Sequence, residues 1–182
     1  TGTVHIPVPD VKRPLALPEL ATVKENNDDK GQGRVKVAFD WQKNGKTTNW
    51  IRVQTPNAGV SGAVPKNRGW VFVPEVGDQV MVSYEHGNPD RPYVTGSVFH
   101  SGSGKGGDKD NKVKSIITRS GNAIVFDDET GSIVITDQTG KQLIMLDGTD
   151  AITVMAKRSI TLTNEAESVI VMDDKSIGLQ AD

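Results

Sequence analysis

Residues 122–155 read NAIVFDDETGSIVITDQTGKQLIMLDGTDAITVM, so short apolar runs alternate with polar clusters rich in Asp, Thr and Gly. The pattern continues to the C-terminal end, and the centres of the apolar runs recur every eight to ten residues. Polar clusters of this kind are typical of turns between strands. Seven strands are therefore expected, at residues 123–126, 133–135, 143–146, 152–155, 160–162, 169–172 and 177–179.

A long helix is the alternative for residues 149–177, which contain neither Gly nor Pro. Eleven of these 29 residues are Val, Ile or Thr, whose branched Cβ restricts the side-chain rotamer in a helix and suits a pleated strand. Pairs such as Ile152 and Val154 also keep the two-residue period of a strand. The segment is therefore interpreted as strands, and the fold class as all-β.

Several of these strands are apolar on both faces, so each needs cover on two sides, which repeating units obtain by stacking. A single-chain solenoid is one alternative, but its period is normally about 20 residues or more. Turns every eight to ten residues fit chains that wrap around one another, so we predict a homotrimeric, intertwined triple-stranded β-helix or β-prism needle. Its predicted core and trimer interface comprises Ile124, Phe126, Val134, Leu143, Met145, Ile152, Val154, Ile160, Leu162, Val169 and Val171.

Composition agrees with a soluble protein of two modest domains: 182 residues, 35% hydrophobic, 24% charged, net charge −2. The absence of cysteine excludes disulfides and Cys-based metal or nucleophile sites. The sequence contains no run of 18 apolar residues, so no membrane-spanning helix is predicted. The start at Thr1, without a charged segment and an apolar stretch, argues against a signal peptide, and the missing initiator Met suggests a fragment or a processed chain.

Four regions are expected along the chain. Residues 1–20 are punctuated by four prolines and predict an extended linker. Residues 21–100 hold about six strands with turns, at 21–24, 34–39, 50–53, 70–73, 79–84 and 93–98, which predicts a small barrel. Residues 101–112 form a flexible Gly/Ser linker, and residues 113–182 form the β-helical needle.

The barrel segment carries several short strings in a characteristic order. They are GRVKV at 33–37 leading to Phe39 and Trp41, WIRV at 50–53, GW at 69–70, PEVGDQV at 74–80, GNPDRP at 87–92 and GSV at 96–98. Together they resemble the central oligonucleotide/oligosaccharide-binding (OB) barrel of the VgrG spike proteins of type VI secretion systems, and of the related contractile phage tail spikes. The resemblance covers roughly residues 21–100, and the β-repeat tail corresponds in kind to the needle of that family.

This resemblance implies a trimeric, cell-puncturing spike at the tip of a contractile injection apparatus. Such a spike is assembled in the bacterial cytoplasm on tube and hub components at its N-terminal side, then injected into a target cell or the medium. It sometimes carries effector cargo and meets the target membrane only transiently. In the family a conical tip protein often covers the C-terminal end, where Ile177, Leu179 and Ala181 would dock it.

Some positions depart from the family pattern. Asp40 stands where many relatives have proline before the tryptophan, and the tail glycines do not form a strict valine-glycine octad. The upstream hub domain and any appended enzyme of complete members are absent from this sequence, so tube docking is not carried over. A phage or tailocin baseplate spike stays an alternative, since its barrel and needle obey the same physics.

A single-stranded nucleic-acid-binding module is the rival within the same fold, because OB barrels often bind through a basic groove with stacking aromatics. Residues 24–68 hold nine Lys/Arg against four acids, with Trp41 and Trp50 between them. Residues 69–99 are acidic, however, and the whole chain is slightly negative. We therefore predict no nucleic-acid partner, and expect the three tryptophans in the barrel core or an interface.

No constellation of an enzyme is expected. The three histidines lie far apart, and the GSGKGG string at 102–107 lacks the following helix that would bind phosphate. The NNDDKG string at 26–31 resembles a calcium loop but places Lys30 where an oxygen ligand is needed. No catalytic residue, cofactor or metal is predicted.

Overall fold

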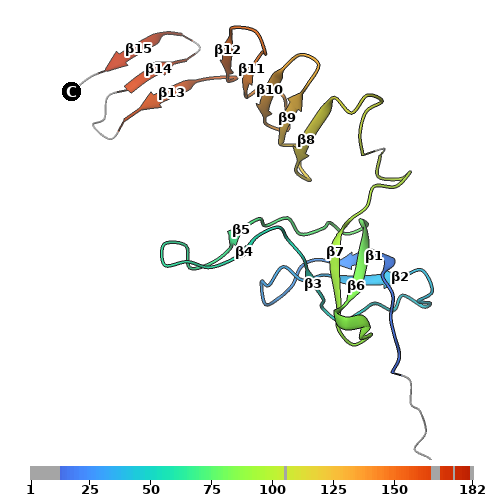
Figure 1. Cartoon of the computed structure of the whole chain (residues 1–182). Coiled ribbons are helices and arrows are strands. Elements are labelled where there is room, and N and C mark those ends of the chain that lie inside the picture. The colour runs from blue at the N-terminus through green and yellow to red at the C-terminus, as the bar shows by residue number, and fades with distance from the viewer. Residues whose placement is uncertain (1–12, 105, 165–168, 174, 181–182) are drawn as a thin grey trace, which may run out of the picture. The chain divides into compact units, whose positions relative to one another are not determined.

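The computed structural model describes residues 13–104, 106–164, 169–173 and 175–180. The chain divides into two units, Thr1–Lys105 and Gly106–Asp182. The boundary falls inside the predicted 101–112 linker, and among the described residues all regular structure apart from one short 3-10 turn is β-structure. The two units are described separately (Figure 1).

The first unit is built on a five-stranded sheet in the order β2-β1-β6-β7-β3. Its strands are β1 (Glu19–Glu25), β2 (Lys36–Phe39), β3 (Arg52–Val53), β6 (Gln79–Tyr84) and β7 (Pro92–Ser97). All neighbours are antiparallel except β3 and β7, which run parallel. The short turn η1 (Glu85–Gly87) leads from β6 towards β7.

The sheet curls until its two ends meet. Val35 and Ile51 immediately precede β2 and β3 in the chain. They form an antiparallel bridge with N···O distances of 3.0 and 2.9 Å. Bulges in β1 and in the β6–β7 ladder increase the twist, as closure of a small barrel requires. The curled sheet of the first unit is consistent with the OB-type barrel that the sequence predicts.

Alternation along the strands builds the barrel core. In β2 and β6 every second residue points inward, so Val37, Val80 and Val82 are completely buried. The buried core consists of Ala21, Val23, Val35, Val37, Phe39, Ile51, Val80, Val82 and Val94. Its mostly aliphatic, β-branched character suits pleated strands, and this core contains no charged residue.

One expectation for the barrel is wrong. Residues 70–73 form no strand; β4 (Ala58–Gly59) and β5 (Arg68–Gly69) instead make a short ladder within a long excursion from the sheet. The three tryptophans lie outside the buried core: Trp41 and Trp70 are exposed, and Trp50 is half-buried under the Lys36 ammonium, 4.8 Å from its ring centroid. Their place in an interface, the other expectation from the sequence, stays a prediction.

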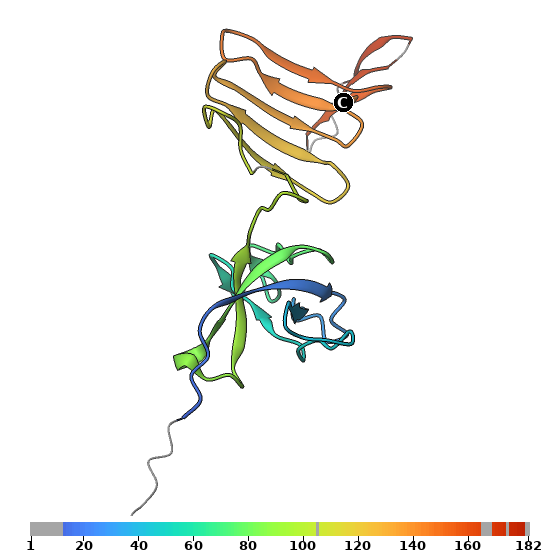
Figure 2. The same ribbon diagram turned by 90° about the vertical axis from the view of Figure 1, so that its right-hand side faces the viewer.

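The second unit contains two antiparallel meanders (Figure 2). One sheet has the order β12-β11-β10-β9-β8 and the other β13-β14-β15. The bounds are β8 (Val113–Ile117), β9 (Ala123–Asp127), β10 (Ser132–Thr136), β11 (Leu143–Leu146), β12 (Ile152–Met155), β13 (Ile160–Thr163), β14 (Val169–Met172) and β15 (Ile177–Gln180). The seven strands expected from the sequence are present, and β8 is an additional one.

We expect Val80→Ala to lower the free energy of unfolding of the barrel by about 2 kcal/mol, because it removes two buried methyl groups and leaves a cavity. The matched substitution Met81→Ala, one residue along β6 on the outer face, should cost clearly less. Urea unfolding followed by tryptophan fluorescence measures both. Equal losses would contradict the inward orientation of Val80.

Candidate functional site

The register of the five-stranded sheet in the second unit decides which side chains lie together. Directly paired residues of antiparallel strands share a face, and successive residues alternate between faces. Ile133 of β10 pairs with Phe126 of β9 and Leu146 of β11, and the next residue, Val134, pairs with Val125 and Met145. Following these pairs across the sheet divides its side chains into two sets.

One set is almost wholly large and apolar, and we call it the apolar face. Its two rows across the sheet are Lys114, Phe126, Ile133, Leu146 and Ile152, and then Ile116, Ile124, Ile135, Ile144 and Val154. Lys114 stands at the end of its row, where its ammonium donates to the carbonyl of Asn111 and the carboxylate of Asp128. The other nine positions carry Ile, Leu, Val or Phe.

The opposite set, which we call the mixed face, combines apolar with small and polar residues. Its middle row is Ser115, Val125, Val134, Met145 and Thr153. Flanking positions include Asp127, Ser132 and Thr136, so this face offers hydrogen-bonding groups that the apolar face lacks. The mixed face is therefore better suited to contact with water, and the apolar face to burial against other apolar groups.

The predicted interface residues divide between these faces. Ile124, Phe126, Ile152 and Val154 lie on the apolar face, whereas Val134, Leu143 and Met145 lie on the mixed face. Five residues that complete the apolar face were not among the predicted interface residues: Ile116, Ile133, Ile135, Ile144 and Leu146. Their apolar character was visible, but only the register shows that they share a face with Phe126.

The three-stranded sheet repeats the division. Ile160 pairs with Met172, and Leu162 with Ile170, which gives a second face of large apolar residues. Val169 and Val171 pair with Thr163 and Thr161 on the other face.

At the end of the chain, Ile177 continues the apolar set by pairing with Met172, and Leu179 takes the register position opposite Ile170. Ala181 lies outside the described residues. Of the three residues predicted to dock a tip protein, two therefore occupy β15, the edge strand of this sheet.

The apolar face is open in the single chain. Phe126 is 40% exposed, Ile135 46% and Ile152 72%, and none of the described residues from 106 onward is buried. Contiguous apolar patches of more than a few hundred Å² are rare on monomeric soluble proteins and mark interaction sites. The face is therefore the candidate functional site of the second unit.

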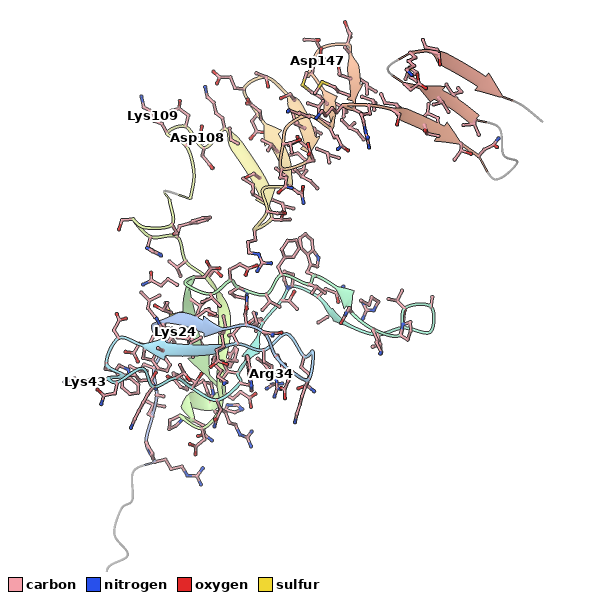
Figure 3. All side chains as sticks on the ribbon, turned by 180° about the vertical axis from the view of Figure 1, so that it is seen from behind. Lys24, Arg34, Lys43, Asp108, Lys109 and Asp147 are labelled. Carbon is pink, nitrogen blue, oxygen red and sulfur yellow. The ribbon has the colours of Figure 1, made fainter. Side chains whose placement is uncertain are left out.

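Carboxylates close the turns that set this register. Asp127, Asp137 and Asp147 follow one another at intervals of ten residues, each at the end of a strand (Asp147 is labelled in Figure 3). The Asp147 carboxylate accepts from the backbone N–H of Thr149 at 2.8 Å and of Ala151 at 3.2 Å. Bonds of this kind hold the chain in a tight reversal.

These hydrogen bonds favour the charged form of the carboxyl groups. The pKa of Asp137 is lowered mainly by the Thr139 hydroxyl, and that of Asp147 mainly by the Thr149 backbone N–H. In the second meander the Lys175 backbone N–H is the main cause of the lowered pKa of Asp173.

Turns at the same end of the strands in the five-stranded sheet stack directly on one another. Gly148, in the β11–β12 turn, has φ +80° and lies against the backbone of Thr130 and Gly131 in the β9–β10 turn; a Cβ there would overlap the Thr130 carbonyl oxygen. At the opposite end of the strands, the backbone N–H of Gln138 in the β10–β11 turn donates to Asn122 Oδ1 in the β8–β9 turn at 3.1 Å. The stacked turns keep neighbouring strands at a fixed spacing.

The described part of the chain holds no group of three or more His, Asp or Glu side chains that could bind a metal ion. Within the same residues, no helix is long and apolar enough to cross a membrane. In the NNDDKG string at 26–31, Asp28 instead makes a two-bond ion pair with Arg34, at 2.7 and 2.8 Å, which strongly lowers the pKa of Asp28.

Comparison with known proteins identifies the barrel. Residues 19–99 match the model of the type VI secretion system/phage-baseplate injector OB domain. Over 99 residues, 52% of this chain, the sequence is 37% identical to the type VI secretion system spike protein VgrG1a of Pseudomonas aeruginosa. Over 111 residues, 55% of this chain, it is 34% identical to the spike protein VgrG3 of Vibrio cholerae.

A third relative is named as a toxin. The actin cross-linking toxin VgrG1 of Vibrio cholerae is 29% identical over 99 residues. The matched regions span only 14%, 10% and 8% of the lengths of these three relatives. The resemblance predicted from the barrel strings is confirmed, and it concerns a short part of much longer proteins.

We expect Gly148→Ala to destabilise the second unit by about 3 kcal/mol or more, because it adds a backbone overlap to the strain of positive φ. Gly140→Ala is the matched control, since Gly140 also has positive φ, +67°, but nothing lies within 4 Å of an added Cβ. It should cost about 1 kcal/mol. Urea unfolding followed by circular dichroism distinguishes the two, and equal costs would contradict the stacking of the turns.

We expect Asp147→Ala to lower the melting midpoint of the second unit at pH 7, where the carboxylate is charged and accepts its turn bonds. A group whose pKa is lower in the folded state contributes stability above its unfolded-state pKa, about 3.9, and loses it as pH falls through the folded-state value. The difference from wild type should therefore shrink below about pH 4.

The control for this pH profile is Asp150→Ala, which removes an exposed carboxylate from the same turn. Its effect on the midpoint at pH 7 should be much smaller. A loss for Asp147→Ala that stayed constant from pH 7 to pH 2.5 would show that the carboxylate charge contributes nothing to the turn.

Proposed function

Since residues 19–99 match the model of the type VI secretion system/phage-baseplate injector OB domain and the chain resembles VgrG spike proteins, we propose that it is the barrel and needle part of a homotrimeric spike. In this proposal the spike stands at the tip of a contractile injection apparatus, punctures target envelopes mechanically and carries effector cargo. It is assembled in the bacterial cytoplasm and then injected. No enzymatic step is assigned to the chain.

The observation that carries the proposal is the apolar face. Nine side chains that are roughly half exposed would each gain on the order of 1 kcal/mol on burial, so one chain contributes on the order of 9 kcal/mol before any cost. Association costs about 4–15 kcal/mol per added chain. Three such faces turned towards a common axis therefore provide a gross gain comparable with or larger than the cost of joining three chains.

The free edges of the sheet support the same arrangement. In the single chain, β8 and β12 end the five-stranded sheet, and the described residues of β12 are exposed along its whole length. An exposed, apolar edge strand invites pairing with another chain. If three copies close their sheets around one axis, these edges are paired, and the result is a stiff rod that transmits force.

In this proposal the apolar face lies inside the trimer and the mixed face outside. Six of the interface residues predicted from the sequence then belong to this core: Ile124, Phe126, Ile152 and Val154, together with Ile160 and Leu162 of the second sheet. Val134, Leu143, Met145, Val169 and Val171 are on the outer side, where they carry less of the assembly energy. This assignment refines the interface expected from the sequence.

The proposal also assigns partners at the two ends. Tube or hub components join at the N-terminal side, and β15, with Ile177 and Leu179, offers an edge strand to a conical tip protein. A phage or tailocin baseplate spike is the alternative setting, and the name of the matched domain family includes the phage baseplate.

The structure gives little support to nucleic-acid binding by the barrel. Arg34 is paired with Asp28, Lys36 with Glu25 and Arg52 with Glu85, at 2.7, 2.9 and 2.6 Å. The Lys36 ammonium also covers Trp50. Cations and aromatics already engaged with one another are less available to phosphates and bases.

We expect the wild-type chain to have a mass of 3 × 19.6 = 58.8 kDa by light scattering, stable to dilution. Ile135→Asp places a charge in the middle of the apolar face of each copy and should give a 19.6 kDa monomer. Val134→Asp, one residue earlier in β10 on the mixed face, is the matched control and should retain the trimer. A wild-type monomer would contradict the needle. A trimer for Ile135→Asp and a monomer for Val134→Asp would mean that the mixed face, and not the apolar face, lies inside the trimer.

A further inference from the structure

The excursion from the barrel between β3 and the buried Pro74 is a built structure, and we call residues 54–72 the arm. The β4–β5 ladder runs through it, and Figure 1 shows it projecting away from the curled sheet of the barrel. The Trp70 N–H donates to the Asn57 carbonyl at 2.9 Å, and the Thr55 hydroxyl to the Trp70 carbonyl at 2.8 Å. At Gly69, with φ +122°, a Cβ would overlap the same Asn57 carbonyl. The arm therefore depends on glycine for its close backbone contact.

The arm carries large apolar side chains that the barrel does not cover. Trp70, Val71 and Phe72 are 51%, 63% and 59% exposed, and Val60 and Val64 are also exposed. An isolated two-stranded hairpin is at best marginally stable in water. An ordered arm with this much exposed apolar surface calls for a covering partner.

A hollow of about 730 Å³ lies between the arm and the Lys30–Gly33 turn at its base. Val53, Val60, Trp70, Val71 and Phe72 contribute apolar walls. Its charged lining residues are Lys30, Lys66 and Arg68, all cations, and residues 41–74 contain no Asp or Glu. The surface that fits this hollow is apolar and acidic.

The same barrel carries a surface of that kind. Val76, Val98 and Phe99 are exposed, Phe99 by 68%. Asp78 lines a small hollow together with Val98 and Phe99, and Glu75 lies next to Val76 in the same turn. This acidic, apolar surface complements the cationic, apolar hollow of the arm.

We propose that the arm hollow of one copy receives the Val76, Val98 and Phe99 surface of the barrel of a second copy. Two different surfaces meet in this contact, so it is heterologous, and such contacts close into rings when the rotation between subunits permits. The inference rests on the proposed trimer, in which each barrel is tethered to the needle by the short 101–112 segment. Tethering on this scale keeps neighbouring barrels at a high effective concentration, so a second copy is the most available partner.

The chain contains no cysteine, so engineered cysteines report on single contacts. A Val71→Cys chain is co-expressed with a differently tagged Phe99→Cys chain, and the mixed assemblies are treated with a short bifunctional maleimide. We expect a cross-linked dimer of the two chains, with the joined peptides identified by mass spectrometry. Pairing Lys43→Cys with Phe99→Cys is the control for random collision and should give little product.

Charge complementarity is tested in the same assay. Lys66→Glu in the Val71→Cys chain should lower the yield of cross-linked product several-fold. Lys46→Glu makes the same charge change at an exposed position outside the arm hollow and should leave the yield unchanged. Equal effects of the two variants would overturn the charge complementarity on which the partner was assigned.

Light scattering of the same samples separates the two proposals. A trimer that gives no product between Val71→Cys and Phe99→Cys overturns the arm contact and leaves the needle standing. A monomer removes the needle and the arm contact together. A trimer with the expected product supports both.

Discussion

The pairing register of the five-stranded meander is the constraint on which the second unit depends. A shift of one residue in any ladder would move Phe126 or Ile135 to the face that now holds Val134 and Met145. With the observed register, two adjacent rows of large aliphatic and aromatic side chains cross the sheet without interruption except at Lys114. The turns enforce this register, because the Asp carboxylates fix where each strand ends and the contact of Gly148 with Thr130 fixes how the turns stack.

The two units solve the burial problem in different ways. The barrel curls until the Val35–Ile51 bridge joins its ends, so it completes an aliphatic core within one chain. The meanders remain open, and the described residues of the second unit include none that is buried. An element that hydrophobic and that open has its stability tied to association, so its folding and its assembly are expected to be one process.

Much of this architecture is readable in the sequence, and the remainder is not, for physical reasons. The seven tail strands are marked by turn clusters such as Asp137 to Gly140, and the barrel by its ordered strings. The division into faces was missed because residues such as Val134 and Ile135 are both apolar, and composition alone does not tell which one pairs with Phe126. The arm was misread as a strand at residues 70–73 because Trp-Val-Phe-Val has strand propensity, whereas Gly69 and the Asn57 carbonyl impose a different path.

In the proposed spike, the alternation of the turns between the two ends of the strands limits how the needle can change its length. Each strand reverses the direction of the chain, so an added single strand would place the next turn at the opposite end of the strands, away from the turn on which it stacks. An added hairpin of about twenty residues returns the chain to the same end and preserves both faces. In the proposed spike, the rod would therefore grow or shorten in pairs of strands, and its reach would vary in steps of two strand spacings, each about 4.8 Å.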